Sequence, residues 1–260
     1  MTDRIYTFGN DERLEFCKLY LEKQSNLGTA VYVLPIPSFR QEVGATGVAE
    51  ALELMRRQLS AGDTILCYGS SEELRRLSLE RGAYLIDAAS DEEYHAEGAR
   101  LTAVGSIARL ITCYGKDLRH IRFGIVGYGR IGRALCMLLV FFGSQVTVYT
   151  RREELRFELG RLGINTVSVR ELEESRGATG ESPFASIDIL INTAPAKTLA
   201  PEDAAALSGV SVIELASGDN IPKEIACQRY DAVPARMLPY SAGVAYAQAA
   251  LRALKRLGRM

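Results

Sequence analysis

Arg122-Phe-Gly-Ile-Val-Gly-Tyr-Gly-Arg-Ile-Gly-Arg133 is the stretch that decides the fold. A short apolar strand at 122–126 runs directly into the spacing Gly127-x-Gly129-x-x-Gly132, and an apolar helix is predicted over about 131–142. Glycines at these positions permit a tight turn, close approach of the backbone to a pyrophosphate, and close packing of the helix on the strand. The amino end of the helix directs N–H groups and the positive end of its dipole at phosphates. The stretch therefore predicts a dinucleotide site.

Strands and helices alternate on both sides of this stretch. Apolar periodicity predicts strands at 4–8, 30–34, 64–68, 84–87, 122–126, 145–150, about 166–167, 187–191 and 210–214. Glycine-containing segments at 43–47 and within 173–186 are predicted as loops. Because such alternation is typical of parallel sheets covered by helices on both faces, we predict an α/β protein.

The apolar helix expected at 98–115 has no strand partner and leads into the glycine-rich stretch, so we interpret it as a linker between two domains. The predicted boundaries are 1–97 for an α/β domain that binds substrate or a partner, and 116–239 for a Rossmann dinucleotide-binding domain. A last helix within 240–260 is expected to pack back on the first domain.

Composition excludes several classes of protein. The 260 residues carry a formal net charge of −1, which gives no reason to expect nucleic acid as a partner. Neither a membrane span nor a signal peptide is predicted, and the five scattered cysteines are interpreted as reduced core residues of a cytoplasmic protein. With only His95 and His120, a histidine-based metal site is not expected.

The strand at 145–150 ends in Tyr149-Thr150-Arg151-Arg152, where a carboxylate would bind the ribose 2′-hydroxyl of NAD. Two arginines instead offer charge-assisted bonds to a 2′-phosphate, so NADP is favoured over NAD. The alternative is that both arginines are solvated residues that open a helix. The residues assigned to the cofactor are Gly127, Gly129, Arg130, Ile131, Gly132, Thr150, Arg151, Arg152, Asn192, Thr193, Ala194, Pro195, Ala216 and Ser217.

Segments Asn192–Pro195 and Ala216–Ser217 enter this set because each follows a buried strand, where ligands lie in open α/β sheets. They suit the nicotinamide side, although ordinary turn chemistry is the alternative. The turn Gly69-Ser70-Ser71 either holds a carboxylate through its N–H groups and hydroxyls or caps the next helix. Asp11 and Arg13 also allow two interpretations. They are a helix cap and a surface charge, or together they form a clamp on an anionic substrate. Candidate substrate residues are Arg13, Ser70, Ser71 and Ser241.

No catalytic acid or base can be assigned from the sequence. His120 precedes the strand at 122–126 and is interpreted as a surface residue, whereas a catalytic part for His95 stays open. A D-specific hydroxy-acid dehydrogenase would place its acid–base histidine later in the chain, so that reaction is disfavoured.

The motifs together resemble a known family. Gly9-Asn-Asp-Glu-Arg13 after the first strand resembles the Gly-Gly-Asp-x-Arg opening of the A-type subunit of dipicolinate synthase. The resemblance continues in order through Thr102-x-x-Gly105-Ser-Ile107, the Gly127 fingerprint, Asn192-Thr-x-Pro195, Leu215-Ala-Ser217 and Ser241-Ala-Gly243. It implies a flavodoxin-like first domain, a Rossmann second domain, and NADP-linked oxidation of a cyclic dihydrodipicolinate-type dicarboxylate during sporulation. It also implies that a B-type subunit is the partner, and we expect a homo-oligomer.

The chain departs from this family in three segments. Gly98-Ala-Arg-Leu101 replaces Asn-Ser-Ile-Pro, Val104 replaces a glutamate, and Leu238–Gly243 is a shortened loop. Two other functions therefore stay open. One is a different NAD(P) dehydrogenase, of the hydroxy-acid or methylene-tetrahydrofolate type, and the other is a non-catalytic nucleotide-binding partner protein.

Overall fold

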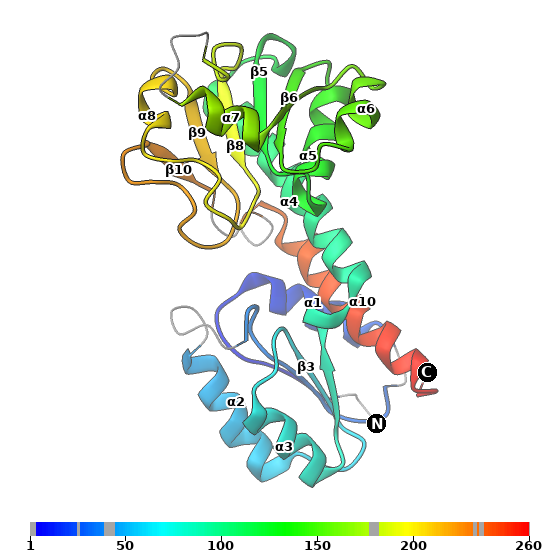
Figure 1. The fold of residues 1–260 in the computed structure, drawn as a ribbon. Helices are drawn as coiled ribbons and strands as arrows, with labels where there is room; N and C mark the ends of the chain where they lie inside the picture. Colours follow the sequence, from blue (N-terminus) through cyan, green and yellow to red (C-terminus); the bar gives the residue numbers. More distant parts are fainter. Residues whose placement is uncertain are drawn as a thin grey trace. The chain divides into compact units, whose positions relative to one another are not determined.

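The computed structural model describes residues 4–24, 27–38, 45–176, 182–230, 233 and 237–259. Of the predicted loops at 43–47 and 173–186, residues 43–44 and 177–181 lie outside these ranges, whereas 45–47 and 173–175 are helical, so the loop prediction is wrong for those six residues. The chain divides into two units: residues 1–101 with 234–260, and residues 102–233. Each unit contains its own parallel sheet (Figure 1).

The first unit has a four-stranded sheet in the order β1-β2-β3-β4. Its strands are β1 (Ile5–Thr7), β2 (Val31–Val33), β3 (Thr64–Cys67) and β4 (Tyr84–Asp87). Its helices are α1 (Glu12–Glu22), α2 (Ala45–Gln58), α3 (Glu72–Arg81), the short η1 (Ala88–Ser90) and α10 (Pro239–Arg256).

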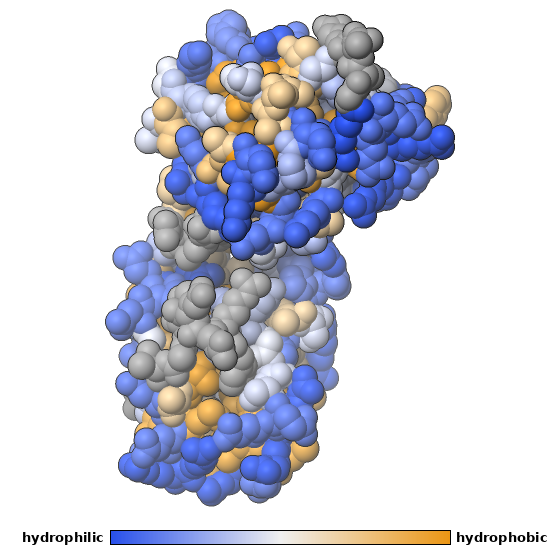
Figure 2. All heavy atoms as spheres, turned by 60° about the vertical axis from the view of Figure 1, so that its left-hand side comes forward, coloured by the Kyte–Doolittle hydropathy of each residue, from blue (hydrophilic) through white to orange (hydrophobic). Residues whose placement is uncertain are grey.

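Alternation along the strands explains why both faces of this sheet are covered. Val31 and Val33 of β2 point to the core that α1 and α10 form, whereas Tyr32 and Leu34 point to the core under α2 and α3. Figure 1 shows α2 and α3 next to each other over one face of the sheet. On the face turned forward in Figure 2, hydrophilic side chains cover most of each unit and are interrupted by smaller hydrophobic patches.

Helix α4 (Glu92–Tyr114) carries the chain from the first unit into the second. It begins earlier than the linker helix predicted at 98–115, because Asp91 accepts a hydrogen bond from the Tyr94 N–H at 2.9 Å and so caps the helix there. Its second half contributes Ala103, Ile107 and Leu110 to the core of the second unit.

The second unit has a six-stranded parallel sheet in the order β10-β9-β8-β5-β6-β7. Its strands are β5 (Arg122–Val126), β6 (Gln145–Thr150), β7 (Asn165–Ser168), β8 (Ile189–Asn192), β9 (Ser211–Glu214) and β10 (Cys227–Arg229). Its helices are α5 (Arg130–Phe141), α6 (Leu155–Gly160), α7 (Val169–Ser175) and α8 (Asp203–Ala206), with the short η2 (Leu118–His120) before β5. Strand order reverses between β5 and β8, and this is the point where ligands bind in doubly wound sheets.

Strand β10 and helix α7 are among the elements of this unit that the sequence analysis does not predict. Strand β10 is exposed throughout and polar, so its residues carry no strand pattern, and it forms by pairing with β9. Helix α7 includes residues 173–175 of the loop predicted at 173–186. The capping box between Ser168 and Glu171 stabilises the first turn of this helix.

The five cysteines were predicted to lie in the core, but two of them are exposed. Cys17, Cys67 and Cys136 are buried, but Cys113 and Cys227 are exposed, so the prediction of core positions holds for three of the five. All five are free thiols.

The close crossing of α1 and α10 yields a test of the first unit. A Cβ on Gly243 would lie 2.9 Å from the Cβ of Phe16 and 3.0 Å from the Cys17 nitrogen, and it would also overlap the Arg13 carbonyl oxygen. We expect Gly243→Ala to lower the free energy of unfolding of this unit by about 1–3 kcal/mol, because backbone cannot move aside as a side chain can.

The measurement is chemical denaturation of the full chain. Gly98→Ala is the control, since nothing lies within 4 Å of a Cβ there and alanine favours a helix more than glycine does. Equal stability of Gly243→Ala and the wild type would contradict this account of the crossing.

Candidate functional site

The glycine-rich loop connects β5 to α5 at the carboxyl edge of the six-stranded sheet. Gly127 has φ +89°, and its N–H donates to the Tyr149 carbonyl oxygen at 2.8 Å. A Cβ on Gly127 would lie 3.0 Å from the Cβ of Ala194. A Cβ on Gly132 would overlap the Gly127 carbonyl oxygen and lie 2.7 Å from Thr193 Oγ1. These two glycines are therefore required by the fold itself.

Gly129 is different from its two neighbours in the motif. Its φ of −82° is one that any residue adopts, and no atom of the described chain lies within 4 Å of a Cβ built there. It is the N-cap of α5, and no side chain caps the helix at that position. Among the described residues, nothing beyond the adjoining chain lies where a Cβ would stand at this helix end, where the motif would place a pyrophosphate.

Arg130 and Ile131 form the first turn of α5, directly behind Gly129. Arg130 is exposed, whereas Ile131 is half-buried. Their backbone therefore lies at the amino end of the helix, in the position that the sequence predicts.

Thr150, Arg151 and Arg152 follow one another at the end of β6, as predicted. Thr150 is buried, and its Oγ1 accepts a hydrogen bond from the Arg152 N–H at 3.1 Å. The Arg152 guanidinium donates to the Tyr128 carbonyl oxygen and so reaches back to the glycine-rich loop. Arg151 is exposed.

A cavity of about 370 Å³ lies beside these residues. Arg156 and Arg170 line it, but each is already paired, with Glu171 at 2.7 Å and with Glu174 at 2.8 Å. The cavity therefore contains charges of both signs, and Arg152 is the lining arginine without a carboxylate partner among those described.

The loop after β8 carries Asn192, Thr193, Ala194 and Pro195. Thr193 Oγ1 donates to the Val126 carbonyl oxygen at 3.0 Å, which ties this loop to the end of β5. Asn192 is buried, and its side chain bonds both the N–H and the carbonyl oxygen of Ala194. The loop is therefore fixed against the glycine-rich turn.

The loop after β9 begins with Leu215, Ala216 and Ser217. Glu214, the last residue of β9, is only 2% exposed, and its Oε1 accepts from Asn192 Nδ2 at 2.9 Å and from the Ala216 N–H at 3.0 Å. Burial raises the pKa of Glu214 above that of an ordinary glutamate, although these two bonds act in the opposite direction. Sequence reasoning missed Glu214. The available signal was a single carboxylate at the end of an otherwise apolar strand.

The predicted cofactor residues are thus brought together at one edge of one sheet. The candidate substrate residues all lie in the first unit. Arg13 follows β1, Ser70 and Ser71 follow β3, and Ser241 lies in the first turn of α10.

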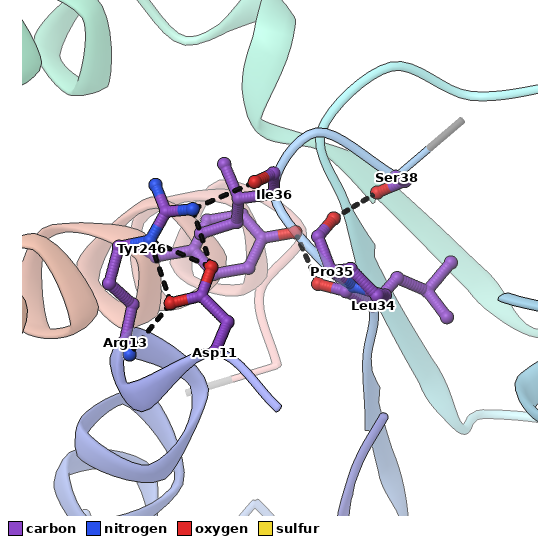
Figure 3. Close-up of polar contacts among 7 residues, drawn as sticks. All are labelled: Asp11, Arg13, Leu34, Pro35, Ile36, Ser38 and Tyr246. Carbon is purple, nitrogen blue, oxygen red and sulfur yellow. Dashed lines mark hydrogen bonds and ion pairs between the residues drawn. The ribbon is translucent and has the colours of Figure 1, made fainter. Parts of the chain in front are cut away.

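Arg13 forms an ion pair inside the first unit (Figure 3). Its side chain is 14% exposed, and its Nε donates to both carboxylate oxygens of Asp11 at 2.9 Å. Its Nη2 also donates to the Ile36 carbonyl oxygen at 2.7 Å. Asp11 in addition caps α1 through the Arg13 N–H, so the cap predicted from the sequence is present.

The turn Gly69-Ser70-Ser71 does hold a carboxylate, and this carboxylate is Asp87 of the same chain. The N–H groups of Gly69 and Ser70 each donate to Asp87 at 2.8 Å. Burial acts to raise the pKa of Asp87, but the bonds from Gly69, Ala89 and Ser70 outweigh it and hold the pKa below its usual value. Ser71 caps α3 through the Leu74 N–H at 3.2 Å, so the alternative of helix capping also applies.

Neither histidine belongs to the glycine-rich loop. His95 Nε2 lies 2.8 Å from the Ala89 carbonyl oxygen, and its ring packs edge-on against Tyr68. His120 is exposed at the end of η2, just before β5.

Metal ligands and membrane spans are both missing from the described part of the chain. No group of three or more His, Cys, Asp and Glu side chains there is arranged to hold a metal ion. Each described helix is too short or too polar to cross a membrane.

Comparisons with known proteins agree with this geometry. Residues 93–178 match the family described as D-isomer specific 2-hydroxyacid dehydrogenase, NAD binding domain. No curated protein matches the sequence.

Several solved structures share the fold. The A-type subunit of dipicolinate synthase from Bacillus halodurans has a TM-score of 0.74 at 17% identity, with 98% of each chain covered. The corresponding dipicolinate synthase chain from Bacillus subtilis has a TM-score of 0.70 at 18% identity, covering 99% of this chain and 97% of that one. D-lactate dehydrogenase from Escherichia coli has a TM-score of 0.55 at 14% identity, covering 98% and 96%.

The resemblance predicted from the sequence is therefore confirmed in the fold. This α/β chain has the two-sheet fold of the A-type subunit of dipicolinate synthase, and the stretch 93–178, most of which lies in the second unit, is similar to the NAD-binding domain of D-isomer specific 2-hydroxyacid dehydrogenases.

Proposed function

We propose that this protein is an NADP-dependent oxidoreductase that acts on a small cyclic dicarboxylate of the dihydrodipicolinate type. The observation that carries the proposal is the open position at Gly129. Neither its φ nor any described neighbour requires glycine there, and Gly129 is the N-cap of α5 in the turn after β5, so a group bound from outside the chain would account for the glycine. A pyrophosphate at the amino end of α5 is such a group.

The residues present fit a nicotinamide dinucleotide. Gly127, Gly129 and Gly132 let the backbone approach the pyrophosphate, and Thr193 and Ala194 lie against the same turn. Ala216 and Ser217 follow the neighbouring strand and would lie on the nicotinamide side. When bound, the dinucleotide supplies a hydride donor or acceptor at its nicotinamide ring.

NADP rather than NAD is proposed from the end of β6. No carboxylate occupies Thr150, Arg151 or Arg152, so nothing at these three positions repels a 2′-phosphate. A guanidinium forms charge-assisted bonds with phosphate, and Arg152 is already held beside the loop by its bond to Tyr128.

The dicarboxylate substrate is proposed from the likeness in fold to dipicolinate synthase, together with Arg13. Arg13 stands at the carboxyl end of β1, and a partly buried guanidinium is suited to a carboxylate. A role in sporulation, a homo-oligomeric state and a partner in the form of a B-type subunit belong to the same proposal.

A second candidate is a protein that binds the dinucleotide without turnover. The observation in its favour is that the first unit uses its own carboxylates on the groups expected to bind substrate. Asp11 occupies Arg13, and Asp87 occupies the N–H groups of Gly69 and Ser70.

Substitution of Gly129 tests the cofactor site. Gly129→Val should lower the free energy of unfolding by about 1 kcal/mol or less, because valine is a poorer N-cap than glycine but meets no described neighbour within 4 Å. It should weaken dinucleotide binding by about 1–3 kcal/mol through overpacking against the pyrophosphate, measured by calorimetry with NADP and NAD.

Gly160→Val is the matched control, because its Cβ position in α6 is equally open and is remote in sequence from the loop. Unchanged affinity of Gly129→Val for both nucleotides would overturn the assignment of the site.

Replacement of Arg151 and Arg152 by Ala tests the choice of nucleotide. We expect the double variant to lose about 1–3 kcal/mol of NADP affinity, as for hydrogen bonds to a charged group, with little change for NAD. Arg161→Ala, an exposed arginine over Phe157, is the control. Equal losses for NADP and NAD would contradict a phosphate clamp, and tighter binding of NAD to the wild type would overturn the preference for NADP.

Turnover decides between the two candidates. With a dihydrodipicolinate-type substrate and NADP, an active enzyme should produce the absorbance band of the reduced nicotinamide. Nucleotide binding without this band on any cyclic or hydroxy dicarboxylate would favour the non-catalytic candidate.

A further inference from the structure

The carboxyl group of Glu214 links the two loops that follow β8 and β9. Its Oε1 accepts from Asn192 Nδ2 at the end of β8 and from the Ala216 N–H beyond β9. Asn192 in turn holds both backbone groups of Ala194. One buried side chain thus fixes the local geometry of both loops.

The second oxygen of this carboxyl group, Oε2, lacks such hydrogen bonds in the described chain. Oε2 is buried and has no hydrogen-bond partner in the described chain. An ionised carboxylate with one oxygen left unpaired away from water is costly, whereas a neutral carboxylic acid places its proton there at much lower cost.

We infer that Glu214 is a positioning residue, and that its neutral carboxyl group holds the loops after β8 and β9 in the arrangement that binds the nicotinamide side of the cofactor. This inference rests on the proposed binding of a dinucleotide by the second unit. Glu214 itself is not placed against the cofactor, and it acts through Asn192 and Ala216.

The surroundings of Glu214 support a neutral acid. Burial is the largest influence on its pKa and raises it, while the bonds from Asn192 and Ala216, the positive charge of Arg229 and the side-chain amide of Asn220 lower it without cancelling the effect. Arg229 lies opposite Glu214 in the β9–β10 ladder, but its guanidinium is paired with Asp219 at 2.7 Å. Cys227, also on β10, interacts with Glu214 as well, since the charge of Glu214 acts to raise the pKa of its thiol.

The sign of the pH dependence follows from this shift. The pKa of Glu214 in the folded protein is raised above its pKa in the unfolded chain. The stabilisation of the folded protein by this group is therefore complete below the pKa of an ordinary glutamate. It is lost as the pH rises through the raised value. If only the neutral form holds the loops, the Kd for the cofactor rises about tenfold per pH unit above that value.

Glu214→Gln tests the inference because glutamine keeps the accepting oxygen, places an amide N–H group where the acid proton would be, and does not titrate. We expect NADP to bind wild type and variant equally at low pH, and the variant more tightly as the pH rises from 5 to 9. The quantity measured is the ratio of the two Kd values by calorimetry, in which the titration of NADP itself cancels. Glu224→Gln, at an exposed glutamate of the same unit, should follow the wild type.

Denaturation without ligand over the same pH range supplies an independent readout. The wild type should lose stability relative to Glu214→Gln as the pH rises. Parallel profiles of the two proteins in both measurements would overturn the inference. If neither NADP nor NAD binds at any pH, the proposed function fails, and with it the link between Glu214 and cofactor binding. The ligand-free profile would then still decide whether a neutral Glu214 holds the loops.

Discussion

The contact of Gly132 with the turn at Gly127 is the constraint on which the second unit depends. Because Gly132 has no Cβ, the first turn of α5 packs directly on the Gly127 carbonyl oxygen and on Thr193 Oγ1. Thr193 bonds in turn to the carbonyl oxygen of Val126. A single missing methyl group therefore brings together the end of β5, the start of α5 and the loop after β8, and any larger residue at Gly132 would separate them.

The loops after β1 and β3 in the first unit and the loop after β5 in the second differ in what meets their donor groups. In the first unit, internal carboxylates occupy the donors, as Asp11 does with Arg13 and Asp87 with the turn at Gly69. In the second unit, the helix end at Gly129 has no side-chain cap. Since amino ends of helices attract anions, the proposed pyrophosphate would take the place that a capping side chain leaves free at Gly129.

Local signals in the sequence were sufficient for much of this fold. The turn at Gly127, strand β5 and the arginines after β6 follow from spacing within a short segment. The capping box at Ser168 is also a local sequence signal for the start of α7, although the helix itself was not predicted. Strand β10, the capture of the Gly69 N–H by Asp87 and the bond from Asn192 to Glu214 depend on residues distant in sequence. No periodicity encodes such pairs, because they arise only when parallel strands come side by side.

The crossing of α10 on α1 has a consequence for synthesis of the chain. Residues 102–233 form a continuous unit, but the first unit contains residues from both ends of the sequence. On a ribosome the face of α1 around Phe16 and Cys17 emerges long before Gly243, the residue whose lack of a side chain lets α10 approach it. The second unit can thus be complete in a nascent chain whose first unit still exposes an apolar surface, and this interval is when a chaperone would find its binding site.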